Sequence, residues 1–401
     1  MLIYDKPVLV LNCKLGALAI MRSLGSLGVP IYGVDSDPHS PGLLSRYCKE
    51  RHVVDFDPEK PQDYLDFILY LGKKIGSRTI LIPTSDELSA FVANNSKQLS
   101  KYFLFPEISS DLVDSLISKE GMYHLALKNN VPTPKTIFPK KLEDVLRCVD
   151  EIFFPVMLKG IDGRRLQGRT GVRMVAVFDK DDLVENYKLL EDPDQPNLMI
   201  QELIPGADDQ VYIFNGYFNA KSECLAAFTG YKVRQFPIHV GCASLGECCW
   251  NEDVAKLTID FMKTIGYRGI LDIGYRLDPR DGLYKVLDIN PRVGQAFRLF
   301  LDESGIDVVR TLYLDLSGQK VPLIIPREGR RWMIEDWDFI SCFHYYQEGT
   351  LKFREWLKSF RRLEEGAWFC WKDPYPFLFM KVAFMAKAFS WLLKQAGLKS
   401  T

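Results

Sequence analysis

The 401-residue chain has no excess of either charge, because 51 Lys and Arg residues balance 52 Asp and Glu residues. A formal charge of −1 gives no strong positive field of the kind that nucleic-acid binding relies on. Apolar residues make up 47% of the chain and charged residues 26%, which is ordinary for a globular protein. Disordered, collagen-like and coiled-coil classes are therefore excluded.

The nine cysteines include no C-x-x-C pair, so metal-binding and redox spacings are absent. The nearest approach is the adjacent pair Cys248 and Cys249. An odd count fits a disulfide framework poorly, which favours reduced thiols and a cytoplasmic protein. The apolar N-terminal run is interrupted too early for a signal peptide and is interpreted as a first strand.

Two nucleotide-binding signatures are also missing, a G-x-G-x-x-G turn and a Walker A loop. Apolar runs nevertheless alternate with helix-like stretches, at 7–11, 17–27, 31–34, 61–75 and 79–82. This alternation predicts a parallel sheet with helical connections. Asp35 is interpreted as capping a strand end rather than binding a ribose. Polar residues 83–87 lie where open sheets bind ligands, but they are equally good helix caps.

A lysine and several glycines follow the apolar strand near residue 156. Lys159 can hold a phosphate as a point charge, and the next segment reads GIDGRRLQGRTGV. Gly163, Gly168 and Gly171 belong to this segment, which is expected to be a loop without a helix. Glycines allow backbone amides to approach an anion closely. A mobile hairpin with solvated arginines explains the segment equally well.

A short strand at 198–204 runs into a Pro-Gly turn and then into Asp208 and Asp209. Exposed backbone at such a hinge can bind a purine edge, and an acid beside it can bind ribose hydroxyls. An ordinary strand–turn–strand is the alternative.

Two strands joined by the turn DPRDG form a predicted hairpin that gathers oxygen ligands. Period-2 alternation places Asp288 and Asn290 on one face, and Asp272 can face them from the partner strand. Two carboxylates and an amide oxygen suit Mg²⁺ or Mn²⁺, with phosphates filling the remaining positions. Arg292 projects from the same face. The alternative is that these acids lie at an edge and are solvated.

Lys232 and Arg234 lie two residues apart in an extended segment and are expected to share one face. They could meet a γ-phosphate or a substrate carboxylate. A solvated strand face is the competing interpretation.

Taken in order, these features resemble the ATP-grasp superfamily up to about residue 315. The segments LIPTSDE, KVRQFP and LDINPR are similar to its D-aspartate ligase and carbamoyl-phosphate-synthetase-related branch of carboxylate–amine ligases. The resemblance implies an α/β and α+β fold, with a pre-ATP-grasp Rossmann-like domain before a two-lobed ATP-grasp fold. The expected parts are a pre-ATP-grasp domain (1–115), a small lobe with linker helix (116–205), a large lobe with the metal site (206–326) and an aromatic-rich helical C-terminal extension (327–401).

The resemblance also implies roles for the residues that match its motifs. Lys119 and Lys159 would hold the α- and β-phosphates of ATP while the glycine loop closes over them. The hinge would bind adenine, with Gln201 in place of the more usual acid. Asp209, in preference to Asp208, would bind the ribose. The hinge residues are Gln201, Glu202, Leu203 and Ile204.

The remaining implied roles concern charge at the reacting centre. Asp272, Asp288 and Asn290 would bind one or two Mg²⁺ ions. Lys232 would help to hold the γ-phosphate, and Arg292 would stabilise the charged intermediate, with Arg234 as a further catalytic candidate. Phosphoryl transfer from ATP to a carboxylate would give an acyl phosphate, which an amine then attacks. The alternatives are a carboxylase-like enzyme and a nucleotide-binding protein with weakened catalysis.

The C-terminal segment 374–395 is mostly apolar but is interrupted by Lys381, Lys387 and Lys394, so a membrane-spanning helix is not expected. A helix on a membrane surface or against a partner enzyme remains one interpretation. A helix packed on the core or in a homodimer interface is the favoured one.

Overall fold

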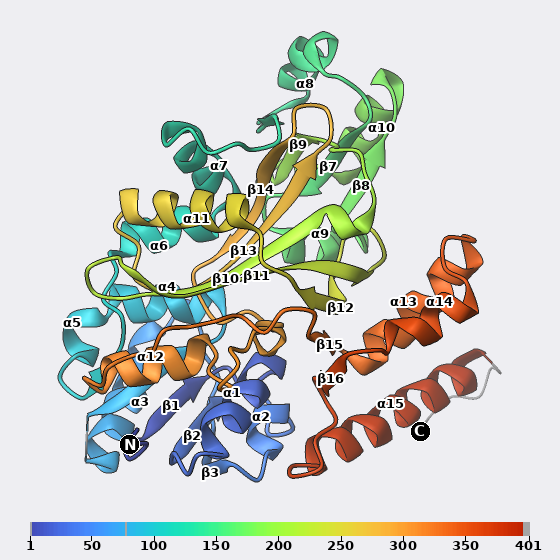
Figure 1. Cartoon of the computed structure of the whole chain (residues 1–401). Helices are drawn as coiled ribbons and strands as arrows, with labels where there is room; N and C mark the ends of the chain where they lie inside the picture. The colour runs from blue at the N-terminus through green and yellow to red at the C-terminus, as the bar shows by residue number, and fades with distance from the viewer. Residues whose placement is uncertain (1, 77, 396–401) are drawn as a thin grey trace.

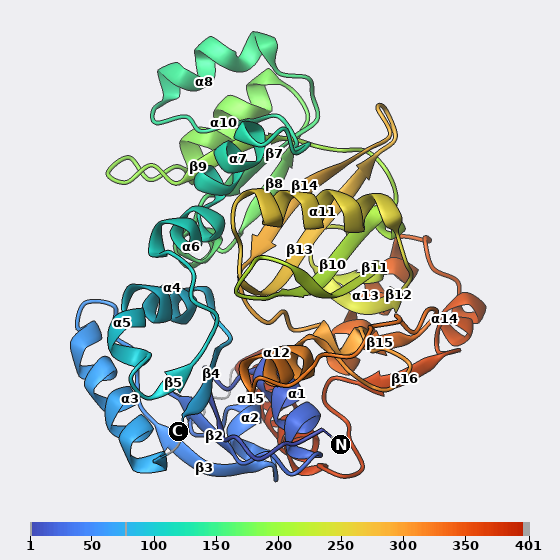
Figure 2. The same cartoon turned by 60° about the vertical axis from the view of Figure 1, so that its left-hand side comes forward.

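The computed structural model describes residues 2–76 and 78–395, without the side chains of residues 151 and 386–395. Three β-sheets follow one another along the chain (Figure 1). The first and second sheets lie at opposite ends of the molecule, and the third lies between them (Figure 2). The mixed α/β and α+β fold class predicted from the sequence is confirmed.

The first sheet is parallel and has the strand order β3-β2-β1-β4-β5. Its strands are β1 (Val8–Leu11), β2 (Ile31–Asp35), β3 (Cys48–Val53), β4 (Thr79–Pro83) and β5 (Phe103–Leu104). The helices are α1 (Leu15–Gly25), α2 (Pro41–Leu44), α3 (Pro61–Ile75), α4 (Asp86–Asn94), α5 (Ser96–Leu99) and α6 (Ser110–Ile117). The order reverses between β1 and β4, so the carboxyl ends of these two strands border the crevice where such sheets bind ligands.

The second sheet is antiparallel, with the order β6-β9-β7-β8. Its strands are β6 (Thr136–Ile137), β7 (Val156–Gly160), β8 (Met174–Val177) and β9 (Leu198–Glu202). The helices of this part are α7 (Lys119–Lys128), α8 (Leu142–Cys148), α9 (Gly163–Thr170) and α10 (Lys180–Leu190).

Helix α9 corrects the expectation of a glycine loop that contains no helix. Asp162 caps it by accepting hydrogen bonds from the amides of Arg164 and Arg165 at 2.9 and 3.1 Å. Gly171 ends the helix with a φ of +83°, a left-handed conformation that glycine adopts without strain. The cap and the terminal glycine were both visible in the sequence, but the number of glycines between them favoured a loop.

The third sheet has the order β14-β13-β10-β11-β12-β15-β16 and is antiparallel except between its last two strands. Its strands are β10 (Val211–Phe218), β11 (Cys224–Phe236), β12 (Cys242–Cys248), β13 (Gly269–Asp278), β14 (Leu283–Asn290), β15 (Arg331–Met333) and β16 (Leu363–Gly366). The helices are α11 (Glu252–Thr264), α12 (Val308–Leu316), α13 (Glu335–Gln347), α14 (Phe353–Ser359) and α15 (Tyr375–Gln395). The C-terminal region is therefore not the purely helical extension expected, because β15 and β16 belong to it and extend this third sheet, which we call the large sheet.

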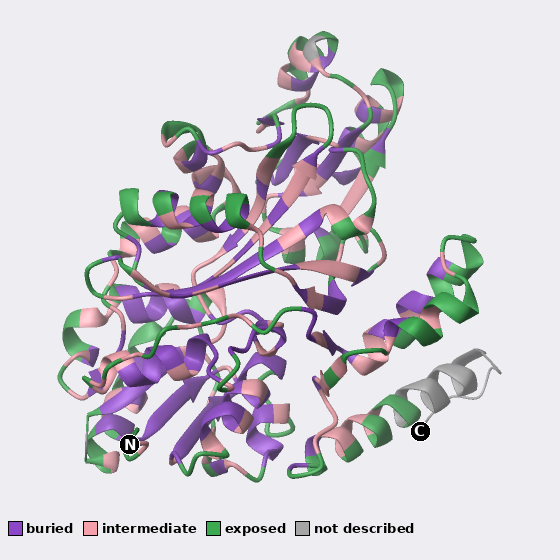
Figure 3. Ribbon diagram, viewed as in Figure 1, coloured by how far each residue is buried: buried purple, intermediate pink, exposed green. Residues whose placement is uncertain are grey.

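One hydrophobic core joins the first domain to the large sheet. It combines β1 and α1 with Phe228 of the large sheet, Tyr313 of α12 and Phe300 of the segment that precedes α12. Buried residues are concentrated where the two parts meet (Figure 3).

A second contact, which is polar, is made by Asp373. This residue is fully buried and accepts hydrogen bonds from Arg22, from the Ser45 hydroxyl at 2.8 Å and from the Arg46 amide at 2.9 Å. The start of α15 is thereby fixed to the first domain.

Among the described residues, no helix has both the length and the apolarity that crossing a bilayer requires. The C-terminal apolar segment 374–395, for which contact with a membrane surface or a partner was considered, is helical from Tyr375. The side chains of Lys387 and Lys394 lie outside the described residues.

Candidate active site

The β13–β14 hairpin brings together the predicted oxygen ligands. Asp272 lies opposite Asn290 in the antiparallel register, and Gly274 lies opposite Asp288. The Asn290 amide donates to Asp288 Oδ2 at 3.1 Å, and Asn290 Oδ1 accepts from Arg292 at 3.0 Å. The alternation of side chains thus produces one polar cluster, as the sequence predicted.

The two carboxylates of this cluster differ in their electrostatics. Burial raises the pKa of Asp272 to about 6, against the opposing charge of Arg292, and the nearby Asp288 carboxylate adds to the rise. Desolvation would also raise the pKa of Asp288, but the Lys119 ammonium outweighs it and the net direction is downward. Lys119 hydrogen-bonds Asp288 directly.

Gly294 makes room for the Asp272 carboxylate. A Cβ atom at this glycine would lie 2.5 Å from Asp272 Cγ and Oδ2. Glycine is therefore the residue that leaves the Asp272 carboxylate in place.

Three lysines from three elements surround the carboxylates. Lys119 comes from α7 and Lys159 from β7 of the second sheet, whereas Lys232 comes from β11 of the third sheet. Loss of hydration and the positive charge of Lys119 together lower the pKa of Lys159 to about 8, against the attraction of Asp288. Burial also lowers the pKa of Lys232, although Asp288 and Asp272 are among the groups that oppose this shift. Its ammonium donates to the Gly241 carbonyl at 2.8 Å.

Arg292 connects the cluster to the first domain, through a contact that the sequence did not indicate. Its Nε lies 2.6 Å from Asp86 Oδ1. Burial would lower the pKa of Arg292, but Asp86 and the two carboxylates of the cluster raise it. Ser85 caps α4 through the Leu88 amide at 3.3 Å. Residues 83–87 therefore contain both features that the sequence allowed: Ser85 is a helix cap, and Asp86 is a polar group that faces the cluster.

The hinge residues take different roles in the structure. Gln201 is buried and donates to the Thr136 hydroxyl at 3.0 Å. The Glu202 side chain pairs with Arg280 at 2.6 Å, and the Glu202 and Leu203 amides donate to other backbone carbonyls. Among the described residues, no hydrogen-bond partner faces the Ile204 amide. Ile204 is therefore the hinge residue whose amide is free for a ligand.

The two acids that follow the hinge, Asp208 and Asp209, have different surroundings. Asp208 accepts from the Tyr345 hydroxyl and lies 3.1 Å from His239 Nδ1, and His239 Nε2 lies 2.9 Å from Glu348. Asp209 is exposed. Tyr345 and Glu348 are more than a hundred residues away from Asp208 in the sequence, so no local pattern could have revealed this network.

Arg234 is not part of the cluster. Its guanidinium forms two 2.8 Å hydrogen bonds with Asp338 of α13, and both side chains are at most 5% exposed. Irregular pairing between β11 and β12 on both sides of Arg234 breaks the simple alternation with Lys232. The expectation of one shared catalytic face is therefore wrong at Arg234, because α13 packs on β11 and supplies a buried partner.

The donor set around the hairpin fits a magnesium ion. Asp272 and Asp288 provide carboxylates, and Asn290 provides an amide oxygen. Asp288 already forms an ion pair with the Lys119 ammonium. The part of the chain that the structure describes contains no group of three or more His, Cys, Asp or Glu residues placed to hold a metal. A metal here would thus be held by two carboxylates and an amide, with phosphate oxygens completing its coordination.

Comparison with known proteins identifies the fold. No protein-family profile matches the chain. The chain is 25% identical over 292 residues to D-aspartate ligase of Enterococcus faecium (strain Aus0004), covering 69% of this chain and 68% of that protein.

Two solved structures illustrate the structural similarity. An ADP complex of N5-carboxyaminoimidazole ribonucleotide synthetase aligns over 82% of this chain and 81% of its own, with a TM-score of 0.63 and 13% identity. The L-amino acid ligase from Bacillus licheniformis aligns over 82% and 76%, with a TM-score of 0.58 and 14% identity. The chain therefore has the fold of these two structures, which confirms the ATP-grasp fold predicted from its motifs.

Proposed function

We propose that the chain is a Mg²⁺- and ATP-dependent ligase that joins a carboxylate to an amine. The supporting observation is the convergence of Lys119, Lys159 and Lys232 on the Asp272–Asp288 pair. A triphosphate and a substrate carboxylate repel each other, and cations fixed beforehand at their meeting point reduce that cost. The D-aspartate ligase and L-amino acid ligase similarities support the same reaction class.

The positions of the residues suggest how they divide the work. Lys119 and Lys159 lie on the small-lobe side and would hold the α- and β-phosphates. The Ile204 amide would bind the adenine edge and Asp209 the ribose, since Asp208 is already bonded. Helix α9, at residues 163–170, would cover the phosphates in place of a flexible loop.

Lys232 and Arg292 lie where the reacting groups would meet. A carboxylate oxygen attacks the γ-phosphorus, the bond to the β-phosphate oxygen breaks, and ADP leaves. The amine then attacks the acyl carbon, releases phosphate and loses a proton. Lys232 would neutralise charge on the transferred phosphoryl group. Arg292, held by Asp86, would face the carboxylate. Magnesium bound by Asp272, Asp288 and Asn290 would supply charge neutralisation at the phosphates.

We also infer the division of the chain and its cellular compartment. The three sheets support a pre-ATP-grasp domain at 1–115, a small lobe at 116–205 and a large lobe from 206, to which the C-terminal part adds β15 and β16. All nine cysteines are free thiols. They support a reducing cytoplasm, where disulfides are rare.

ADP release tests the proposal. The purified chain is supplied with ATP, Mg²⁺ and pairs drawn from a panel of amino acids, small carboxylates and amines. We expect ADP to form only when both an acid and an amine are present. ADP formation with bicarbonate alone would support a carboxylase-like enzyme instead. Nucleotide binding without turnover on any pair would support a binding protein.

A further inference from the structure

The helices α13 and α14 and the first half of α15 expose an unusual amount of apolar surface. We call the segment 335–385 the C-terminal arm. Eleven large apolar side chains between residues 339 and 385 are exposed, whereas the described part of the preceding chain exposes sixteen. The eleven are Phe339, Phe343, Tyr346, Phe353, Leu357, Trp371, Tyr375, Leu378, Val382, Phe384 and Met385. Patches of this kind mark interaction sites.

The exposed residues form stripes rather than scattered positions. Phe339, Phe343 and Tyr346 are spaced i, i+4 and i+7, so they line one face of α13. Other positions of α13, including Cys342 and Tyr345, are buried, and the Tyr345 hydroxyl accepts a hydrogen bond from the Gln235 amide of β11. The apolar face is thus an outer surface of a helix that is already packed on its inner side.

Apart from Glu355, the exposed charges of the arm that make no ion pair within the described residues are all positive. These are the seven cations Lys352, Arg354, Lys358, Arg361, Arg362, Lys372 and Lys381. Each acid of the arm has a partner within the protein. Asp338 and Asp373 pair with arginines, Glu348 meets His239, and Glu364 and Glu365 pair with arginines. Glu335, Asp336 and Glu355 accept hydrogen bonds from backbone or indole N–H groups.

We propose that the arm docks on an anionic lipid bilayer. Aromatic and aliphatic side chains interleaved with unpaired lysines and arginines are the chemistry of an interfacial helix on acidic headgroups. A second copy of the chain fits less well, because a two-fold interface brings the same patch against itself and would set these seven cations against the same seven cations of the other copy. This inference does not depend on the proposed enzyme activity.

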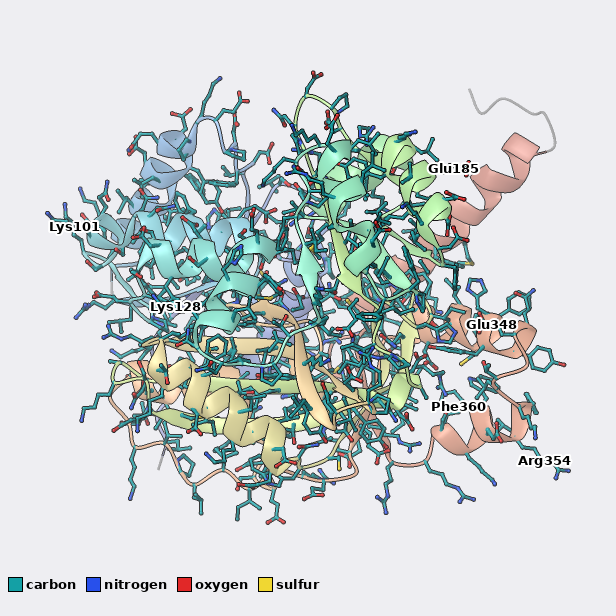
Figure 4. The ribbon with its side chains drawn as sticks, turned by 90° about the horizontal axis from the view of Figure 1, so that it is seen from above. Lys101, Lys128, Glu185, Glu348, Arg354 and Phe360 are labelled. Carbon is teal, nitrogen blue, oxygen red and sulfur yellow. The ribbon has the colours of Figure 1, made fainter. Side chains whose placement is uncertain are left out.

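The shape of the molecule is consistent with one docking face. The α13–α14 pair and α15 both project from the same side of the molecule (Figures 1 and 4). Glu348, Arg354 and Phe360 lie on this side, whereas Lys101 and Lys128 lie on the opposite side (Figure 4). A bilayer can therefore meet the arm while the opposite lysines stay in solution.

Vesicle binding of the full-length chain tests the proposal. Co-sedimentation is measured with phosphatidylcholine vesicles and with equimolar phosphatidylcholine–phosphatidylglycerol vesicles, each at 50 and 500 mM salt. We expect binding to the anionic vesicles at low salt, with weaker binding at high salt because the Debye length shortens. Failure to bind anionic vesicles, or equal binding to both compositions, would overturn the proposal.

Matched variants locate the surface. Arg354→Ser with Lys358→Ser should weaken binding about 30-fold, from the usual contribution of two basic residues at an acidic surface. Phe343→Ser with Leu357→Ser should also weaken it. Lys101→Ser with Lys128→Ser removes equal charge from the opposite side and should leave binding unchanged. All three double variants should melt at the temperature of the native chain.

Two outcomes would contradict the assignment of the surface. Equal losses for the arm and control variants would show a nonspecific effect of net charge. A dimer in solution that the Phe343→Ser, Leu357→Ser variant converts to monomer, without any vesicle binding by the native chain, would assign the arm to a second copy.

Discussion

Replacing Arg234 with methionine tests whether this residue is structural or catalytic. Arg234 is 4% exposed and Asp338 is 1% exposed, and two 2.8 Å hydrogen bonds join them. Removing one partner leaves the other charge buried and unpaired, which typically costs about 3–5 kcal/mol of unfolding free energy. Because the pair is almost fully buried, salt should screen this loss only weakly.

The loss should appear in thermal unfolding followed by calorimetry. If the large lobe melts as a unit of about 150–250 residues, a loss of this size lowers its midpoint by roughly 6–20 °C. Arg327→Ala breaks the exposed pair with Glu364 and should cost only about 0–1 kcal/mol. The double variant Arg234→Met, Asp338→Leu should recover much of the stability, because it removes both charges together.

Turnover of the folded fraction separates the two roles. At a temperature below the new midpoint, Arg234→Met should keep its kcat and its KM for ATP within a few-fold of the native values. A large fall in kcat with an unchanged midpoint would refute the structural assignment and return Arg234 to the reacting centre.

Three further predictions concern the cluster itself. Asp288→Asn should lower ADP formation by about 10²–10³-fold with little change in melting temperature, and unchanged turnover would remove Asp288 from the metal site. Lys159 is charged below its pKa of about 8, so ATP affinity should weaken as the pH rises from 7 to 9. Isothermal titration should show a flatter profile for Lys159→Arg, and identical profiles would contradict a phosphate contact. Gly294→Ala should raise the Mg²⁺ concentration needed for half-maximal activity, since the new Cβ displaces Asp272. A Mg²⁺ requirement equal to that of the native chain would refute the steric argument.

Local patterns were sufficient for much of the fold. The alternation of apolar runs and helices predicted the first sheet, and the helix expected at 61–75 is α3 (Pro61–Ile75). The DPRDG turn and the period-2 spacing placed Asp272 opposite Asn290. These predictions succeed because a strand's alternation and a hairpin's turn are fixed by neighbouring residues.

Predictions that depended on distant contacts failed or could not be made. Arg234 was assigned to the reacting face because Asp338, its partner, lies 104 residues away. Asp86 lies 206 residues from Arg292, and Asp208 lies 137 residues from Tyr345. One sequence carries no signal for such pairings, since burial and partner are decided by packing between elements. The glycine segment failed for a local reason, because Asp162 and Gly171 supplied caps that outweighed the flexibility of the glycines between them.

The C-terminal arm begins in one domain and ends in another. Its first helix is attached to the large lobe through Asp338, and its last helix is attached to the first domain through Asp373. These are the same two domains that Arg292 and Asp86 bring together at the cluster. A flat support that engages both ends of the arm would hold the domains at a single relative angle. The contact between Asp86 and Arg292 would then be controlled from outside the cluster.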